Sequence, residues 1–483
     1  MMIRRVVGFM LLVAALLSGV TAAPRAGAQS IRLPEIRDIT LPNGARILLA
    51  ERHEVPLIAL NAYVRGGSLT DPEGKEGIAS LTAEMLRKGA GKRSAEQIAE
   101  AVDGVGGAFA TGAGMEGFYV SGEFMKSDAD LMIDLVKSVL RNPTFPDSEF
   151  VKLRSQSVDG ILALKDDPGN VYRAYGGSYF YGAHPYGRPG GGDESTLAAL
   201  TRDDALRCYR DQFGADRLIL VVVGDFTVSS MEPRLRAAFG GWGKAASALP
   251  PVPEPERVGG RRVLLVDKPD ATQTYFWIGN RGVSAVDSDR DVLDVANTAF
   301  GGTFGSLLNT AMRIKSGLTY GASCRLQRFS VGGSVGIGSF TKNESTQQAI
   351  DLALETLRAF RAAGLEPARL SSARNYINGQ FPTDLETAGQ LAGQLAVNAF
   401  YGLGNEEITG YPARIAAVDS AAVRRAVARV YPPDSDLVLV MVGNAAKVRT
   451  VAKRYGPVTE IALARPMIQA LRDARQRSRP TAR

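Results

Sequence analysis

The sequence predicts an α+β protein made of two similar domains, because an internal repeat, the order of its elements and its length all favour that fold class. The main observation is the aliphatic run at residues 218–224 (LILVVVG), which recurs at residues 437–443 (LVLVMVG). Each run follows a segment of helical character and has the composition of a strand buried on both faces. Strands precede helices in each half, which favours α/β sandwiches over a doubly wound sheet. A chain of 483 residues is also too long for one hydrophobic core.

A proline-rich segment separates the two halves. Residues 248–256 contain four prolines, which cannot donate backbone hydrogen bonds to a helix or a sheet. We therefore expect an N-terminal domain at 29–247, a linker at 248–259 and a C-terminal domain at 260–464. The last segment, 465–483, carries six Arg and one Asp, and we expect it to be a solvated or frayed basic tail. Attachment of this segment to an anionic membrane or to a partner is the alternative.

The N-terminus has the pattern of a secretory signal peptide. Arg4 and Arg5 precede a 15-residue apolar stretch, and Ala26-Gly27-Ala28 then forms a small-residue cleavage site. We expect residues 1–28 to be removed by cleavage near Ala28, so that the protein is periplasmic or secreted. A retained membrane anchor is the alternative, although the apolar stretch is short for a bilayer span.

The net charge of +7 does not indicate a nucleic-acid-binding protein, because the charge is concentrated at the two ends of the chain. Residues 1–28 contribute +3 and residues 465–483 contribute +5, which leaves −1 for the body between them. A nearly neutral body has no basic surface that would bind a phosphate backbone. We therefore expect no nucleic-acid partner.

The two cysteines, Cys208 and Cys324, lie in different halves of the chain. A disulfide, which an exported protein is able to form, would have to join the two domains. Two separate buried thiols are therefore the favoured state, and the wide spacing excludes a zinc finger.

Local patterns predict several individual elements. The pair Asn43-Gly44 between apolar runs is typical of a hairpin turn. Ser94 and Gln97 form a capping box at the start of a short helix at 94–102. The three-to-four spacing of apolar residues predicts a longer helix at 347–363.

Residues 71–89 (DPEGKEGIASLTAEMLRKG) resemble the active-site helix of the insulinase/pitrilysin family, and most of all its bacterial processing-peptidase branch. The resemblance implies two homologous α/β-sandwich domains of the zinc-peptidase type. In that family the helix carries H-x-x-E-H, in which two His bind one zinc ion and the Glu activates a water molecule. The corresponding positions here are Ser80, Ala83 and Glu84, so the resemblance implies that all three roles are lost.

The remaining candidate metal ligands are also missing. The third ligand of the family is a Glu on a later helix, which corresponds here to residues 158–161, where the only acid is Asp159. A relic site for a hard cation, made by Glu84 and Asp159, is the alternative. The chain has only two histidines, far apart in sequence: we interpret His53 as an exposed residue at a strand end and His184 as a structural loop residue. We therefore expect no metal and no cofactor in this chain.

Residues 105–111 resemble the strand that follows the active-site helix in the family, where a sheet edge accepts the backbone of the substrate. Processing enzymes often have Asn where this chain has Ala110. An ordinary edge strand is the alternative interpretation.

The second half keeps the other part of the family's site. Arg313 and Tyr320, seven residues apart, resemble the Arg/Tyr signature, an Arg at a helix end and a Tyr entering a strand. The resemblance implies that Arg313 donates to a substrate carbonyl and that the Tyr320 hydroxyl stabilises the tetrahedral intermediate. A helix-end Arg beside an ordinary strand Tyr is the structural alternative.

Together these features imply a non-catalytic, substrate-binding subunit of a two-chain zinc metallopeptidase. Its partner would be a homologous subunit that bears the zinc ion, in a heterodimer that hydrolyses peptides. The alternative is a peptide-binding or scaffold protein of the envelope with no role in proteolysis. An enzyme that is active by itself is the least favoured reading, because the zinc motif is replaced.

Overall fold

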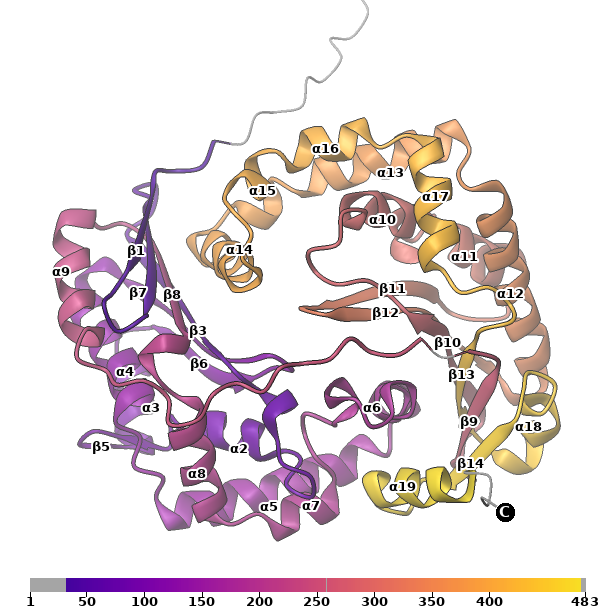
Figure 1. Ribbon diagram of the computed structural model, residues 1–483, viewed down its shortest axis with the longest axis horizontal. Coiled ribbons are helices and arrows are strands. Elements are labelled where there is room, and N and C mark those ends of the chain that lie inside the picture. Colours follow the sequence, from indigo (N-terminus) through magenta and orange to yellow (C-terminus); the bar gives the residue numbers. More distant parts are fainter. Residues whose placement is uncertain (1–31, 258, 479–483) are drawn as a thin grey trace, which may run out of the picture.

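The computed structural model describes residues 32–257 and 259–478, so the predicted signal peptide lies outside the described residues. The first half contains a six-stranded sheet of order β1-β2-β8-β3-β7-β6 (Figure 1). Its strands are β1 (Ile36–Thr40), β2 (Arg46–Glu51), β3 (Leu57–Arg65), β6 (Ala108–Ala113), β7 (Gly117–Met125) and β8 (Leu218–Gly224). A separate two-stranded ribbon joins β4 (Gly89–Ala90) and β5 (Arg93–Ser94).

The second half contains a six-stranded sheet of order β14-β9-β13-β10-β12-β11. Its strands are β9 (Arg262–Asp267), β10 (Gln273–Arg281), β11 (Ala322–Phe329), β12 (Gly332–Lys342), β13 (Val438–Gly443) and β14 (Val458–Ala462). Five strands correspond between the sheets, and the repeated aliphatic runs form the equivalent strands β8 and β13. The sixth strand differs, because β1 runs antiparallel to β2 whereas β14 runs parallel to β9. The predicted α+β fold class is confirmed.

Helices accompany each sheet. In the first half they are α2 (Ile78–Met85), α3 (Ala95–Asp103), α4 (Ala129–Arg141), α5 (Asp147–Leu164), α6 (Pro168–Tyr181), α7 (Glu194–Ala199), α8 (Arg202–Gln212) and α9 (Val228–Phe239), with short 3₁₀ turns η1 (Ser68–Thr70), η2 (Lys126–Asp128), η3 (Pro185–Gly187) and η4 (Ala215–Arg217). In the second half they are α10 (Arg290–Asn297), α11 (Leu307–Asn309), α12 (Thr346–Ala363), α13 (Pro367–Gln380), α14 (Ala388–Tyr401), α15 (Glu406–Thr409), α16 (Tyr411–Ala417), α17 (Ser420–Val430), α18 (Ala445–Ala452) and α19 (Met467–Ser478). The second half also has π-helical turns η5 (Thr298–Gly302) and η6 (Thr310–Lys315) and 3₁₀ turns η7 (Asn343–Ser345) and η8 (Thr383–Leu385).

The local predictions are confirmed. Asn43-Gly44 lies in the hairpin between β1 and β2, where Gly44 has a φ of 96° that other residues rarely adopt. The Ser94 side chain accepts from the Gln97 amide while the Gln97 side chain accepts from the Ser94 amide, so the capping box starts α3. Helix α12 begins one residue before the predicted helix at 347–363 and ends with it.

The two halves exchange one long helix each. Helix α6 of the first half covers one face of the second sheet, where Val171 and Tyr175 share a buried cluster with Val440. Helix α14 of the second half covers one face of the first sheet, where Leu391 packs in a cluster with Val221. Figure 1 shows each helix beside the sheet of the other half. Each sheet is therefore covered on both faces only when both halves are present.

The expectation of a frayed tail is wrong for residues 465–478 of the C-terminal segment, and residues 479–483 lie outside the described residues. Residues Met467–Ser478 form helix α19, which buries Met467, Ala470, Leu471 and Ala474 against the second sheet and α6. These four apolar residues recur with the three-to-four spacing of a helix face, a pattern that the numerous arginines obscure.

Arginines on the outer side of α19 also have partners in the first half. Arg475 donates to the Ser178 carbonyl at 2.6 Å, and Arg472 forms ion pairs with Glu73 and Glu76. The positive charge of this segment is thus partly used to attach α19 to the first half.

Both cysteines are free thiols, as favoured from the sequence. Cys208 packs against the core of the first half and Cys324 lies in the core of the second. Burial raises the pKa of the Cys208 thiol to about 12, which keeps it protonated and unreactive at neutral pH. Within the described ranges, no helix is long and apolar enough to cross a membrane.

A buried carboxyl group fixes the start of α2. Asp71 is 1% exposed, and its two oxygens accept hydrogen bonds from the backbone amides of Gly77 at 2.8 Å and Ala79 at 3.1 Å. Arg188 donates to the carbonyls of Leu69 and Asp71, which ties the loop after η3 to the same point. Burial outweighs these donors and raises the pKa of Asp71 to about 8.

We predict that replacing Leu471 by Ala lowers the free energy of unfolding by about 2–5 kcal/mol, because the change leaves a cavity between α19 and the second sheet. The control Gln476→Ala, at an exposed position of the same helix, should change stability by less than about 0.5 kcal/mol. Urea unfolding measures both. Equal effects of the two substitutions would mean that α19 is not docked.

We also predict that Asp71 makes stability depend on pH. Because the pKa of Asp71 is about 8 in the folded chain and ordinarily 3.8, the folded state binds a proton more tightly than the unfolded state between these pH values. The free energy of unfolding should therefore fall as pH rises from about 4 to about 8, by at most about 1.4 kcal/mol per pH unit from this group. In Asp71→Asn that part of the decline should disappear, which urea unfolding at pH 5 and pH 8 measures. If the free energy of unfolding of Asp71→Asn declined as steeply as that of the wild type, the pH dependence would arise from other groups.

Candidate functional site

The positions that correspond to the zinc motif all lie on α2, and the structure uses two of them for packing. The Ser80 hydroxyl donates to the Gly190 carbonyl at 2.7 Å, which holds the glycine-rich loop against the helix. Ala83 is fully buried in the core of the first half. Glu84 is half-buried and has no hydrogen bond or ion pair within the described residues. One remaining carboxylate does not make a zinc site, for which three protein ligands are usual.

The third-ligand position is on α5, as expected, but it offers no ligand. Val158 and Ile161 pack against the core of the first half, whereas Asp159 is exposed. Across residues 32–257 and 259–478, no group of three or more His, Cys, Asp or Glu side chains is arranged to hold a metal ion. Glu84 and Asp159 thus belong to no such group in this part of the chain.

Both histidines have the surroundings that the sequence analysis expected. His184 Nδ1 accepts from the Tyr186 amide and Nε2 donates to the Pro253 carbonyl at 2.8 Å, which connects the loop before η3 to the proline-rich segment. The His53 side chain is 56% exposed beyond the end of β2, with Nδ1 2.8 Å from Asp225. That hydrogen bond, together with one to Glu51, raises the pKa of His53.

Arg313 and Tyr320 are brought into direct contact. The guanidinium carbon of Arg313 lies 4.5 Å from the ring centroid of Tyr320 and 4.8 Å from that of Phe304, so the cation is held by two aromatic rings. Tyr320 is 76% exposed and Phe304 is 63% exposed. Within the described part of the chain, the Arg313 side chain has no hydrogen bond and no ion pair. Its donors are thus free for a ligand or another chain.

The local backbone explains this geometry. Arg313 lies in η6, a π-helical turn that widens the helix after α11, and such turns are frequent at functional sites. The Asn309 side chain donates to the Phe304 carbonyl at 2.7 Å and accepts from the Ala322 amide at 3.3 Å. Asn309, which is buried, thereby fixes the loop that carries Phe304 relative to the start of β11.

Phe304 is the site residue that sequence analysis missed. It lies in the segment Gly301-Gly302-Thr303-Phe304-Gly305, whose glycines are typical of a turn and do not indicate a contact with Arg313. A large aromatic residue between glycines is a detectable signal, because a turn at the surface cannot bury it.

The degenerate zinc positions and the Arg/Tyr pair lie apart in this chain. Figure 1 shows α2 and α11 in different halves, on opposite sides of the molecule. Within the described ranges, no hydrogen bond, ion pair or ring contact joins Arg313 or Tyr320 to Ser80 or Glu84. Any reaction that uses Arg313 and Tyr320 therefore needs a reactive centre from outside these positions.

The strand expected to be a sheet edge is one. Among the strands of the described residues, β6 pairs only with β7, and its outer side has no partner strand there. Ala110 is exposed on β6, and the adjacent Gly112 allows the ring of Tyr119 to lie against the strand, since a Cβ there would be 2.1 Å from the Tyr119 hydroxyl. The edge is thus accessible, with small side chains in front of it.

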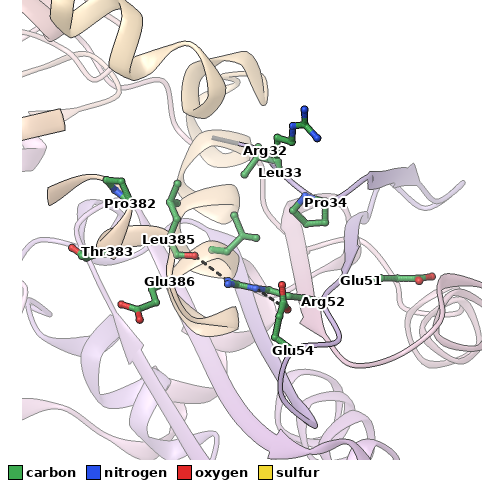
Figure 2. Close-up of a pocket in the computed structure, with 11 residues that line it drawn as sticks. Arg32, Leu33, Pro34, Glu51, Arg52, Glu54, Pro382, Thr383, Leu385 and Glu386 are labelled. Carbon is green, nitrogen blue, oxygen red and sulfur yellow. Dashed lines mark hydrogen bonds and ion pairs between the residues drawn. The ribbon is translucent and has the colours of Figure 1, made fainter. Parts of the chain in front are cut away.

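A hollow of about 640 Å³ lies where the N-terminal segment meets the loop before α14 (Figure 2). Arg52 crosses it, donating to the Leu385 carbonyl at 3.0 Å and to Glu54 at 3.2 Å. The bond to Leu385 joins the end of β2 to η8 of the other half. The hollow is therefore part of the contact between the halves.

Comparisons with known proteins agree with this structure. The model of the insulinase family, peptidase family M16, matches residues 46–189, and that of the peptidase M16 inactive domain matches residues 199–377. An uncharacterised zinc protease of Streptomyces coelicolor is 27% identical over 400 residues, which cover 82% of this chain and 86% of that protein. An uncharacterised zinc protease of Bacillus subtilis is 24% identical over 355 residues, or 73% of this chain and 85% of that protein.

Solved structures share the fold. The crystal structure of a peptidase M16 inactive domain from Pseudomonas fluorescens aligns with a TM-score of 0.80 at 22% identity, covering 85% of this chain and 98% of that one. A protease from Helicobacter pylori aligns with a TM-score of 0.78 at 18% identity, covering 85% and 100%. The resemblance seen in residues 71–89 is thereby confirmed. The chain belongs to the insulinase family, peptidase family M16, as a peptidase homologue.

Proposed function

We propose that this chain is the non-catalytic, substrate-binding subunit of a two-chain zinc metallopeptidase. The observation that carries the proposal is the Arg313–Tyr320 pair, in which the guanidinium lies over the exposed Tyr320 ring. The half-buried Arg313 side chain has no ion pair in the described part of the chain. Stability alone does not explain such an arrangement, since an exposed ring gains little from burial.

The zinc-motif positions support the division of roles. Ala83 belongs to the core and Ser80 bonds to a backbone carbonyl, so both side chains are used within the fold. The partner would be a homologous subunit that supplies the zinc ion and its bound water. The two chains would form a heterodimer that encloses an extended peptide.

The chemistry of the pair suits a stabilising role at the reacting carbonyl. The guanidinium of Arg313 donates to a substrate carbonyl, and the Tyr320 hydroxyl donates to the oxygen on which negative charge develops. Two rings hold the guanidinium before substrate arrives, so little reorganisation is needed. This chain lacks the zinc motif, and the partner would supply it. In return, this chain would supply the donors Arg313 and Tyr320.

The predicted signal peptide indicates the compartment in which the chain would act. We propose that the chain acts outside the cytoplasm, in the periplasm or after secretion, once residues 1–28 are removed. The envelope is therefore where the partner should be sought. A pull-down of the tagged chain from its host's envelope should recover, in stoichiometric amount, a homologue that bears H-x-x-E-H. Recovery of a lone chain or a self-dimer would favour the peptide-binding or scaffold alternative.

We predict that Arg313→Ala in the assembled pair lowers kcat/KM for peptide cleavage by about 10²–10³-fold, because one fixed donor to the developing charge is lost. Tyr320→Phe, which keeps the stacked ring and removes only the hydroxyl, should also lower kcat/KM. The control Arg425→Ala removes an exposed arginine from α17 and should leave the rate unchanged. Size-exclusion chromatography verifies that each variant still assembles. An assembled Arg313→Ala pair with the wild-type rate would refute the proposal.

A further inference from the structure

We propose that a hollow between α6 and strands β10–β12 binds the C-terminal end of a peptide whose last residue is large and apolar. The hollow measures about 410 Å³, within the range of small-ligand sites. Its aromatic walls would take the side chain, and two arginines at its rim would take the carboxylate. This inference rests on the proposed function only in that the ligand is a peptide.

The hollow exists because of the helix exchange. One wall comes from α6 of the first half and the other from the second sheet. Four aromatic side chains line it: Tyr172, Phe180, Tyr181 and Trp277. Phe180 and Trp277 meet edge to face, with ring centroids 5.6 Å apart. Such walls favour a large apolar or aromatic side chain.

Four glycines line the hollow. Gly176 and Gly177 lie in the interior of α6, where each Gly destabilises the helix by about 0.5–1 kcal/mol relative to Ala. A Cβ at Gly177 would meet nothing within 4 Å, so the space in front of it is free. Across the hollow, a Cβ at Gly336 would be 2.1 Å from Trp277 Nε1, and one at Gly338 would be 3.0 Å from the Tyr172 hydroxyl. These two glycines therefore let Trp277 and Tyr172 lie against β12.

The polar residues of the hollow favour an anion. Arg173 and Arg325 line it, and no Asp or Glu belongs to the lining. Arg325 lies on β11 directly opposite Gly336, so its side chain shares the face of the sheet that forms the hollow. Arg173 lies 5.4 Å from the Tyr172 ring and has only a 3.5 Å contact to Asn170. Neither arginine has an ion pair within the described ranges.

A peptide C-terminus supplies both features on one residue. Its α-carboxylate accepts from guanidinium groups, which match carboxylates in a bidentate manner, while its side chain is one bond from the Cα atom. Ser323, Gln327 and Ser334 add side-chain donors for the preceding peptide groups. An internal acidic residue next to an apolar residue would place the carboxylate and the apolar side chain on different residues, and thus further apart than at a C-terminus.

The first experiment uses the isolated chain and the tryptophan of the hollow. The sequence has two tryptophans, and Trp242 packs in the core of the first half, so Trp242→Phe leaves Trp277 as the only one. We expect acetyl-Ala-Ala-Phe with a free carboxylate to change the Trp277 fluorescence saturably, and its amide to bind at least tenfold more weakly. Isothermal titration of the wild type gives the same comparison without the core substitution. Equal affinity of acid and amide would overturn the proposal.

Variants test the place of binding. Gly177→Leu should fill the hollow and weaken binding at least tenfold, whereas Gly160→Leu should not, since Gly160 is an exposed glycine of α5 with equally free space. Arg325→Gln should reduce the preference for the acid over the amide. Wild-type affinity in Gly177→Leu would overturn the proposal. Binding of 3-phenylpropionate as tight as that of the peptide would also overturn it, because that result would indicate a site for a free aromatic acid.

The outcome is separable from that of the proposed function. Arg313 does not line the hollow, so Arg313→Ala should bind the peptide like the wild type. Binding that fails while Arg313→Ala still abolishes cleavage by the pair would remove this site alone. Binding that holds while the pair is insensitive to Arg313→Ala would remove only the role at the partner's zinc.

Discussion

The structure depends on the coverage of both faces of each sheet, which neither half achieves alone. All seven residues of β8 and all six of β13 are buried, so each of these strands needs apolar neighbours above and below. One face is covered by helices of the same half and the other by a helix of the opposite half. Removing α6 or α14 would expose a row of valines. Each half therefore needs a helix of the other half to complete the burial of its own sheet.

Polar contacts between the halves follow the same arrangement. Glu116, in the turn before β7, accepts hydrogen bonds from the Tyr186 hydroxyl at 2.7 Å and from the Ser330 amide of the second half at 3.0 Å. Helix α19 attaches the end of the second half to α6 through Arg475. The exchange thus fixes the relative position of the halves, and a hollow that both halves line keeps a defined shape.

The sequence predicts those features that depend on local pattern. The repeated aliphatic runs identify the central strands, and Ser94 with Gln97 identifies the start of α3, because strand burial and capping are encoded within a few residues. The family resemblance identifies Arg313 and Tyr320 as a pair. The sequence does not predict the exchange of α6 and α14, because their apolar faces indicate burial without indicating which sheet they bury.

The positive charge of residues 465–483 suggested a solvated tail rather than the helix α19. Its arginines dominate the composition, whereas the four small or apolar residues on one face decide the structure. Phe304 was missed for a related reason. Its role arises from a contact with Arg313 that needs the loop to be fixed by Asn309, a tertiary effect that the turn pattern does not encode.

The two candidate site regions, on α2 and at η6, differ in how far their side chains take part in the packing of the fold. On α2, the positions that correspond to ligands are now parts of a core and of a backbone contact, and a buried Asp71 fixes the start of the helix. At η6, Arg313 contacts the rings of Tyr320 and Phe304, and both rings are exposed, so substitution of these residues should disturb packing little. A residue pair that contributes little to folding yet is held in a fixed geometry is explained by contact with something outside the chain. This asymmetry is the physical reason for assigning the reactive metal to a partner and the stabilising donors to this chain.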